Sequence, residues 1–189
     1  MTPQRLTCTA AADSLPLHDN ATNRVSVEQF KAAFRHHPGG VAVITADDGT
    51  RPVAMTATSV SSVSADPPLL LFSVSELSSS APTLLASQSV VVHLIDATTS
   101  DIAKLGATSK IDRFADTSMW HRLPTGEPVF HDVSVWLRCR PVRRFRAGNA
   151  TIVIAEAIEA HAQVDDPRDG LAYVNRTWHR LSEHSQLAD

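Results

Sequence analysis

The stretch Thr56-Ala-Thr-Ser-Val-Ser-Ser-Val-Ser64, followed by Ala65-Asp-Pro-Pro68 and the apolar run Leu69-Leu-Leu-Phe72, decides the fold of this chain. Its polar and apolar residues nearly alternate, as in a strand with one buried face. Threonine and valine favour strands, and the hydroxyl groups add hydrogen-bond donors and acceptors along the other face. A second hydroxyl cluster, Ser78-Ser-Ser80, follows one predicted strand later. Together the two clusters could line a shallow site for a polar, planar, phosphorylated ligand.

Most of the remaining chain has strand patterns separated by short connections. A helix is predicted to begin at Ser26, where Ser26-Val-Glu-Gln29 has the form of a capping box, and to end at Pro38-Gly-Gly40. Two shorter helices are predicted at 81–87, with Ser80 as the N-cap, and from Thr98 to Gly106. Residues 107–132 look irregular. The predicted strands are 41–45, 53–64, 69–75, 90–95, 133–145, 151–164, 171–174 and 178–181.

This order of elements predicts a mainly β fold. Strands outnumber helices and no regular βαβ alternation appears, so an antiparallel β-barrel with a few peripheral helices fits better than a parallel sheet. The 189 residues suffice for one domain. We expect a flexible N-terminal extension at 1–24, the domain at 25–183 and a C-terminal tail at 184–189.

Composition excludes several classes of function. The net charge of −3 gives no electrostatic footprint for nucleic acid. No apolar run is long enough to cross a bilayer, and the N-terminus lacks the pattern of a secretory signal. The two cysteines, Cys8 and Cys139, lie far apart in different contexts. A disulfide is therefore not expected, and a cytoplasmic location fits.

The order of several motifs resembles the flavin reductase-like family, the short NAD(P)H:flavin oxidoreductases that supply reduced flavin to two-component monooxygenases. The match begins at Phe34-Arg35 and Pro38-Gly-Gly-Val-Ala-Val-Ile-Thr45 and continues from Met55 through the opening stretch. Later matches, in order along the chain, are Ser78-Ser-Ser80, Val91-Val-His-Leu94, Asp112-Arg-Phe114, Gly126-Glu-Pro-Val129 and Ala147-Gly148 with Thr151–Glu156. The resemblance covers roughly 30–182 and is closest to the reductases of desulfurisation monooxygenases.

The resemblance implies a split β-barrel of Greek-key type, a homodimer with the flavin at the subunit boundary, and a flavin-dependent monooxygenase that receives reduced flavin. It implies FMN or FAD as the flavin and NADH or NADPH as the hydride donor. The flavin carries the chemistry, so no catalytic side chain is expected. The turn Ser78-Ser79-Ser80 would hold the phosphate, and Arg113 would lie near the ribityl-phosphate end. The residues implied along the ring and ribityl groups are Thr56, Ala57, Thr58, Ser59, Val60, Ser62 and Val63.

One departure from the family pattern leaves alternatives open. Family members usually carry Gly-Asp-His after the long strand turns back, with the histidine near the nicotinamide, whereas this chain has Gly148-Asn149-Ala150. The chain is then either a reductase with altered pyridine-nucleotide binding or a flavin-binding protein without hydride transfer, acting as a carrier or sensor. A flavin-dependent biosynthetic enzyme is the third possibility.

Structural roles compete with each functional one. The hydroxyl-rich strand could be a half-exposed strand, Ser78–Ser80 only a helix cap, and Arg113 a surface ion pair with Asp112 or Asp116. His93 is interpreted as a hydrogen-bonded barrel histidine. The arginines of 138–146 predict a solvated face, with attraction for dinucleotide or flavin phosphates as the alternative. No metal site is predicted, because no ligand set has a recognisable spacing.

Overall fold

The computed structural model describes residues 13–14, 24–162 and 168–188. Its strands are β1 (Asp13–Ser14), β2 (Gly39–Gly40), β3 (Ala42–Asp47), β4 (Pro52–Ala57), β5 (Ser61–Ala65), β6 (Pro68–Ser75), β7 (Val90–Leu94), β8 (Trp120–Arg122), β9 (Pro128–Phe130), β10 (Val135–Ala147), β11 (Ala150–Ala162), β12 (Gly170–Val174) and β13 (Thr177–Leu181). Its helices are α1 (Val27–Arg35), α2 (Ala81–Ala86), α3 (Ser100–Ala107) and the 3-10 turn η2 (Glu183–Ser185).

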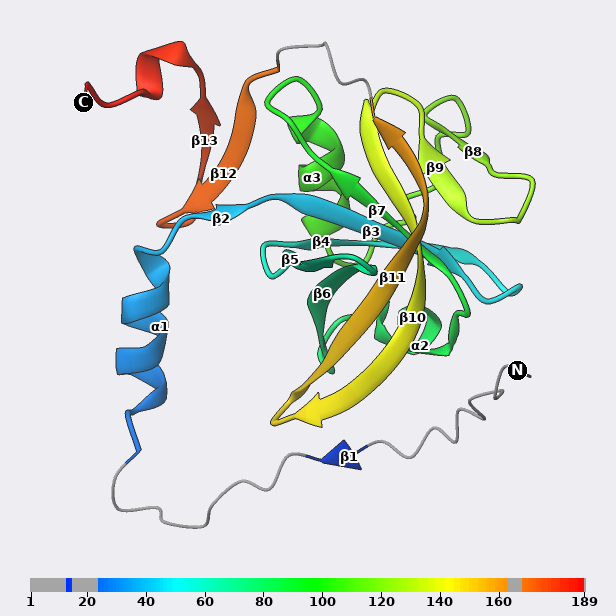
Figure 1. The fold of residues 1–189 in the computed structure, drawn as a ribbon, viewed down its shortest axis with the longest axis horizontal. Coiled ribbons are helices and arrows are strands. Elements are labelled where there is room, and N and C mark those ends of the chain that lie inside the picture. Colours follow the sequence, from blue (N-terminus) through cyan, green and yellow to red (C-terminus); the bar gives the residue numbers. More distant parts are fainter. Residues whose placement is uncertain (1–12, 15–23, 163–167, 189) are drawn as a thin grey trace.

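One large antiparallel sheet dominates the molecule, as predicted. Its strand order is β4-β3-β7-β10-β11-β6-β5, and the short β1 pairs in parallel with β10. Figure 1 shows the long β10–β11 hairpin crossing the sheet, with α2 and α3 lying against it. A smaller sheet, β13-β12-β2, and the hairpin β8–β9 complete the described strands. The prediction of a mainly β fold is confirmed.

The prediction of one continuous strand over 53–64 is wrong. The chain leaves β4 after Ala57, passes through Thr58-Ser-Val60, and enters β5 at the opposite end of the strand order. The hydroxyl of Ser59 accepts a hydrogen bond from the backbone N–H of Ser73 at 3.1 Å, which holds this connection against β6. The two hydroxyl-rich halves therefore belong to the two edge strands of the same sheet.

The helix predictions are confirmed in position but not in every detail. Ser26 and Gln29 form the expected capping box, with both reciprocal hydrogen bonds at 3.1 Å. The Ser80 hydroxyl makes no capping bond to α2. Gly106 lies inside α3 rather than after it, because the helix continues to Ala107. The irregular stretch 107–132 also contains β8 and β9, strands too short for a periodic pattern.

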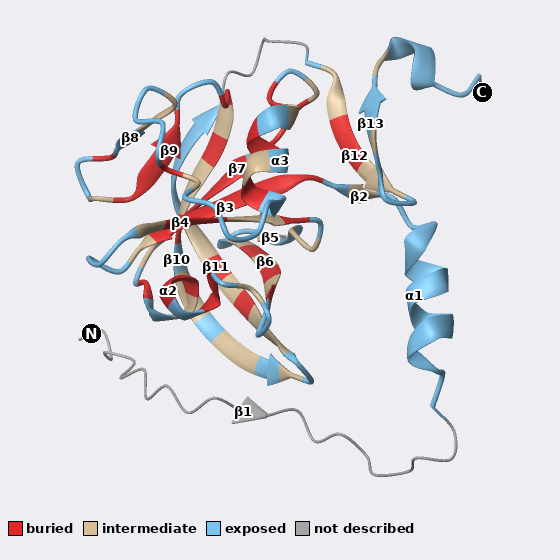
Figure 2. Ribbon diagram, turned by 180° about the vertical axis from the view of Figure 1, so that it is seen from behind, coloured by how far each residue is buried: buried red, intermediate tan, exposed pale blue. Residues whose placement is uncertain are grey.

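Two large clusters of buried apolar residues and a smaller one, Val91, Leu123, Val129 and Trp136, form the core of the described residues. One large cluster lies between the sheet and α2 and includes Phe72, Leu84 and Val92, and the other lies between the sheet and α3 and includes Val43, Ile102 and Phe130. Figure 2 shows buried residues concentrated on the central strands, while α1 stands apart and fully exposed. Within the described part of the chain no helix is long and apolar enough to cross a membrane. The predicted extension at 1–24 falls largely outside the described residues, as does Cys8.

A fully buried histidine joins three strands. The Nδ1 atom of His93 on β7 lies 3.0 Å from the carbonyl oxygen of Val43, and its Nε2 accepts a hydrogen bond from the N–H of Phe130 at 3.2 Å. Both ring nitrogens are satisfied when the ring is neutral. Burial disfavours the charged ring and lowers the pKa of His93 from 6.5 to about 4. The interpretation of His93 as a hydrogen-bonded structural residue is confirmed.

Candidate functional site

A cavity of about 1050 Å³ lies where β4, the end of β6 and the segment after α3 meet. Serine and threonine hydroxyls, basic side chains, apolar side chains and the carboxylate of Asp112 line it. Its principal residues are Arg51, Val53, Met55, Thr56, Ser75, Ser78, Ser79, Ser80, Gly106, Lys110, Asp112, Arg113, Phe114, Trp120 and Arg122. This combination suits an anionic ligand with an aromatic or planar part.

The turn 75–80 presents its serines to this cavity. The backbone N–H of Ser78 donates to the carbonyl of Ser75 at 3.0 Å, and the hydroxyl of Ser78 accepts from the N–H of Ser80 at 3.3 Å. Ser80 is buried, and its hydroxyl donates to the carbonyl of Ala54 on β4 at 2.9 Å. Ser79 is exposed at the cavity wall. The turn is therefore fixed to β4 through Ser80, while its other hydroxyls stay available to a ligand.

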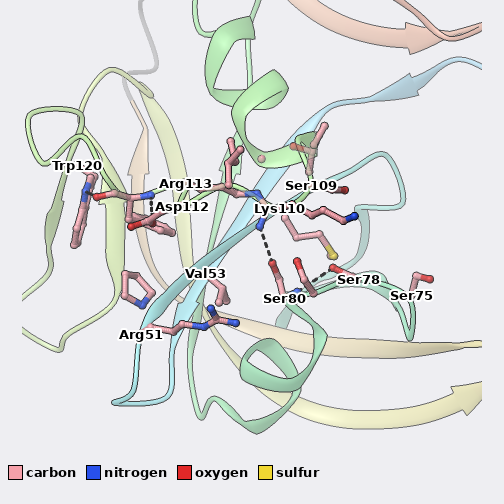
Figure 3. A pocket seen from close by; sticks show the side chains of 18 of the residues that line it. Arg51, Val53, Ser75, Ser78, Ser80, Ser109, Lys110, Asp112, Arg113 and Trp120 are labelled. Atoms are coloured by element: carbon pink, nitrogen blue, oxygen red, sulfur yellow. Dashed lines mark hydrogen bonds between the residues drawn. The ribbon is translucent and has the colours of Figure 1, made fainter.

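Arg113 is held in place by backbone carbonyls rather than by carboxylates. Its Nε donates to Leu105 O at 3.3 Å, one Nη donates to Thr108 O at 2.6 Å, and the other lies 3.4 Å from the Ser80 hydroxyl. Partial burial lowers the pKa of this guanidinium, yet an arginine stays charged in a protein. The surface ion pair with Asp112 or Asp116 is not observed. Arg113 instead offers a fixed positive charge beside the serine turn (Figure 3).

The floor of the cavity comes from β4 and α3. The hydroxyl of Thr56 donates to the carbonyl of Ala103 at 2.6 Å, so its hydrogen is committed to the helix. A Cβ on Gly106 would lie 2.4 Å from that same hydroxyl oxygen, so only glycine permits this approach of α3 to β4. Met55 and Val53 add apolar surface beside Thr56.

An aromatic wall faces the serine turn. Trp120 meets Phe114 edge to face with ring centroids 4.9 Å apart, and its indole N–H donates to the Phe114 carbonyl at 3.1 Å. Arg122 lies over the Trp120 ring at 5.5 Å and forms an ion pair with Asp47 at 2.6 Å. Figure 3 shows Trp120 at one side of the cavity and Ser75 and Ser78 toward the other.

The structure brings together only part of the predicted flavin-binding set. Thr56, Ser78, Ser79, Ser80 and Arg113 all line the cavity. The others lie elsewhere. Ala57 is buried in the core, and Thr58 borders a small pocket beside α1. The hydroxyl of Ser59 is hydrogen-bonded to β6, Val60 and Ser62 line a separate groove, and Val63 is exposed. The break between β4 and β5 separates them, because the second half of the stretch crosses to the other edge of the sheet.

Asn149 and Ala150 form the tip of the β10–β11 hairpin. The carbonyl of Asn149 accepts from the N–H of Glu76 at 3.0 Å, and Ala150 pairs with Ser75, which itself lines the cavity. Neither Asn149 nor Ala150 lines the cavity. The nicotinamide role that the resemblance assigns to this position stays a prediction.

The arginines of β10 are mostly engaged on the outer surface. Arg138 pairs with the buried Glu127 at 2.6 Å, Arg140 pairs with Glu156 at 2.6 Å, and Arg146 pairs with Glu76 at 2.9 Å. No arginine of β10 lines the main cavity. The predicted solvated face is therefore observed for Arg140, Arg143 and Arg146, whereas Arg138 lies in a largely buried ion pair with Glu127.

Several lining residues were missed by sequence reasoning. Arg51 follows a turn, and Lys110 and Trp120 lie in the stretch that the sequence predicts to be irregular. A weak signal existed for Lys110, because it precedes the Asp112-Arg-Phe114 motif by two positions. Neither Arg51 nor Trp120 had such a signal, since only the tertiary fold places the β3–β4 turn and β8 beside the serine turn.

The residues present fit a phosphorylated flavin. Phosphate needs charged and neutral hydrogen-bond donors, which the fixed guanidinium of Arg113, the ammonium of Lys110 and the hydroxyls of Ser78 and Ser79 supply. The isoalloxazine ring needs a flat apolar surface, which the adjacent β4 side chains supply. Among the described residues no group of three or more His, Cys, Asp or Glu could hold a metal ion.

Comparisons with known proteins point to the same chemistry. The chain is 45% identical over 137 residues to an NADH:FMN oxidoreductase of Rhodococcus erythropolis. The aligned region covers 72% of this chain and 71% of that protein. It is 35% identical over 126 residues to the stachydrine N-demethylase reductase subunit Stc3 of Rhizobium meliloti, covering 66% of this chain and 54% of that protein.

Solved structures agree in fold. A flavin reductase domain protein from Arthrobacter sp. FB24 superposes with a TM-score of 0.76 at 32% identity, covering 82% of this chain and 95% of that one. The NADH:FAD oxidoreductase SgcE6 of Streptomyces globisporus, solved with NAD and FAD fragments, superposes with a TM-score of 0.75 at 29% identity, covering 84% and 94%. The model of the flavin reductase like domain matches residues 34–182. This chain therefore belongs to the flavin reductase-like family.

Proposed function

We propose that this protein is an NADH:FMN oxidoreductase that supplies reduced flavin to a partner monooxygenase. The observation that carries the proposal is the cavity beside Ser78–Ser80, where Arg113 is fixed by two backbone carbonyls and one serine. Identity of 45% to an NADH:FMN oxidoreductase supports FMN and NADH over FAD and NADPH. Flavin bound there would supply the hydride acceptor for the nicotinamide.

The residues then divide into three roles. Arg113, Lys110, Ser78 and Ser79 bind the FMN phosphate, and Ser80 holds Arg113 and the turn in position. Thr56, with its neighbours Met55 and Val53, forms the surface under the ribityl chain and the ring. We assign the hydride chemistry to the flavin and no acid–base role to a side chain of the cavity.

The remaining predicted residues suggest that a second copy completes the site. Val60 and Ser62 line an apolar groove of about 490 Å³ on the outer face of β5, β6 and β11, with Leu69, Leu137 and Ile158. Leu94 and Ile158 are large apolar residues left exposed there, and Val27, Phe30 and Phe34 are left exposed on α1. We propose a homodimer that covers this groove, with the flavin near the subunit boundary and the sheet closed as a split β-barrel.

The partner assignment rests on the relatives. Reductase components of two-component systems occur among them, including that of a trigonelline monooxygenase of Acinetobacter baylyi at 31% identity over 139 residues. We propose a flavin-dependent monooxygenase as the recipient of reduced flavin, in the cytoplasm. The free, buried Cys139 is compatible with that compartment.

Equilibrium titration with FMN, followed by light scattering of the complex in solution, tests these assignments. Wild-type protein should bind FMN and measure as a dimer, and Ile158→Glu should shift it toward monomer by placing a charge in the groove. A wild-type monomer that binds FMN normally would contradict the dimer but not the flavin site.

A further inference from the structure

Helix α1 presents an apolar face that no described part of its own chain covers. Val27, Phe30 and Phe34 are spaced three and four residues apart, so they share one face of the helix. Their exposed fractions are 59%, 57% and 59%, and α1 has no buried residue. A helix of nine residues is shorter than the roughly 12–15 residues that a helix needs to persist alone in water. The apolar face of α1 therefore calls for a packing partner.

The same chain holds α1 away from its own large sheet. The carbonyl oxygen of Arg35, the last helical residue, accepts a hydrogen bond from the N–H of Asn175 at 2.7 Å. The chain then enters β2, which pairs with β12 in the small sheet. Figure 1 shows α1 extending from that small sheet and standing apart from the large one. The apolar face is thus fixed in place and open to a second molecule.

The groove lined by Val60, Leu137 and Ile158 on β5, β6, β10 and β11 complements this face. Both surfaces are apolar at the centre, and they carry opposite charges at the edge. The charged residue that lines the groove is Glu159. Phe30 and Phe34 line a hollow of about 360 Å³ between α1 and the β12–β13 turn, and the charged residues that border it are all basic: Lys31, Arg35 and Arg176. Opposite charges around two apolar surfaces favour one mutual orientation.

The two charges best placed to meet have no partner within the described residues. Neither the ammonium group of Lys31 nor the carboxylate of Glu159 forms an ion pair or hydrogen bond with a residue that the structure describes. Arg138 is the cross-strand partner of Glu159 on β10, but its guanidinium is bonded to Glu127 at 2.6 Å. The negative charge at the groove therefore stays available to a cation from another chain.

Resting on the proposed homodimer, we infer that α1 is an exchanged arm that lies in the groove of the second copy. Its apolar face covers the groove, and Lys31 lies beside Glu159 of the partner subunit. An amphipathic helix in an apolar groove is a recurrent mode of recognition. Twofold symmetry makes the contact twice, because each subunit supplies one helix and one groove. Both halves of the complementary pair are present on this chain, which favours a second copy over an unrelated partner.

Charge reversal at this pair tests the exchange in the full-length protein. Lys31→Glu and Glu159→Lys each bring like charges together at both contacts of a homodimer. Each should raise the dimer dissociation constant about tenfold at low ionic strength, as measured by sedimentation equilibrium. An equimolar mixture of the two variants should form a heterodimer about as stable as the wild type, because both of its contacts then pair opposite charges. A helix lying on its own groove would give no such rescue.

Phe34→Ser tests the apolar part of the contact. It removes a large side chain from both contacts and should raise the dimer dissociation constant about a hundredfold. Leu187→Ser is the matched control, since Leu187 is 93% exposed and lines neither surface. Glu183→Lys is the control for charge reversal, at an exposed position on η2. Both controls should leave the constant within twofold of the wild type. If Phe34→Ser unfolds α1, the mixing experiment still decides, because Lys31 and Glu159 are exposed.

The outcomes separate this inference from the proposed function. A wild-type dimer that Ile158→Glu dissociates, but that Lys31→Glu and Phe34→Ser leave unchanged, would overturn the exchange and leave the homodimer standing. A mixture of the charge variants that is no more dimeric than either variant alone would also overturn the exchange. A monomeric wild type would overturn both the exchange and the homodimer. Reduction of FMN by NADH, measured on the same samples, tests the reductase assignment independently, and its failure would leave the exchange untouched.

Discussion

A Cβ atom on Gly106 would lie 2.4 Å from the hydroxyl oxygen of Thr56, closer than any relaxed contact. The same hydroxyl donates to Ala103 O at 2.6 Å, so turning it away would break its hydrogen bond to α3. The approach of α3 to β4 therefore depends on one missing side chain and one hydrogen bond, and it forms the floor of the cavity.

Gly106→Ala should destabilise the fold by about 1–3 kcal/mol, as overpacking of a rigid contact does. In addition it should weaken FMN binding, because α3 must move away from β4. Urea unfolding and FMN titration would measure both effects. Ala107→Gly is the control for helix propensity, at an exposed neighbouring position. Helix propensity alone favours alanine over glycine, so if Gly106→Ala stabilises the fold by as much as Ala107→Gly destabilises it, the close contact is not as described.

Ser80→Ala should cost about 1–2 kcal/mol of stability, because it leaves the carbonyl of Ala54 without its buried hydrogen-bond donor. It should also raise the Kd for FMN, since Arg113 loses one of its three supports. Ser79→Ala changes an exposed hydroxyl in the same turn and should leave stability within about 0.5 kcal/mol. Equal stabilities of the two variants in urea unfolding would contradict the structural role of Ser80.

The alternation and turn residues of the sequence predicted the strands well, because each strand of this sheet has a clear local pattern. The capping box at Ser26 is a local device and was likewise predicted. The break at Thr58–Val60 was not, since the hydroxyl-rich pattern continues unchanged across the point where the chain leaves one edge strand for the other. Gly106 was interpreted as a helix end because glycine often follows the last turn of a helix. The close approach to Thr56 that requires glycine there is a tertiary contact, which no local pattern reports.

The candidate site was predicted only where it coincides with short motifs. Ser78–Ser80 and Arg113 came from the family resemblance and lie together in the structure. Arg51 and Trp120 lie far apart in sequence and reach the cavity only through the packing of β4 and β8. No local pattern reports such long-range placement, which explains why the second half of the site was missed.

His93 should remain neutral down to acidic pH. Its pKa is about 4 in the fold against about 6.5 when unfolded, because burial disfavours the charged ring. A depressed histidine pKa means that this contribution to stability is full above about pH 6.5 and declines as the pH falls toward 4. The loss is about 3 kcal/mol at 1.36 kcal/mol for each pH unit between the two values.

Nitrogen NMR of the histidine ring would check this prediction. Between pH 8 and 5 the His93 resonances should not titrate, and they should show a protonated Nδ1 and an unprotonated, hydrogen-bonded Nε2. A midpoint near 6.5 for His93 would show that its nitrogens are not held as described.

Restoring the family pair with Asn149→Asp and Ala150→His should change kcat/KM for NADH by less than threefold. Both residues lie at the hairpin tip and neither lines the cavity. Steady-state kinetics with NADH would measure the effect. A gain of tenfold or more would show that the nicotinamide lies beside the hairpin tip and that the natural sequence has lost a contact there.

The central claim is tested most directly by anaerobic stopped-flow absorbance of FMN bound to the purified protein. On mixing with NADH the oxidised flavin band should bleach in a single saturable phase, far faster than free FMN and faster than with NADPH. FMN that binds but does not bleach with either nucleotide would contradict the reductase assignment and favour a flavin carrier or a flavin-dependent biosynthetic enzyme.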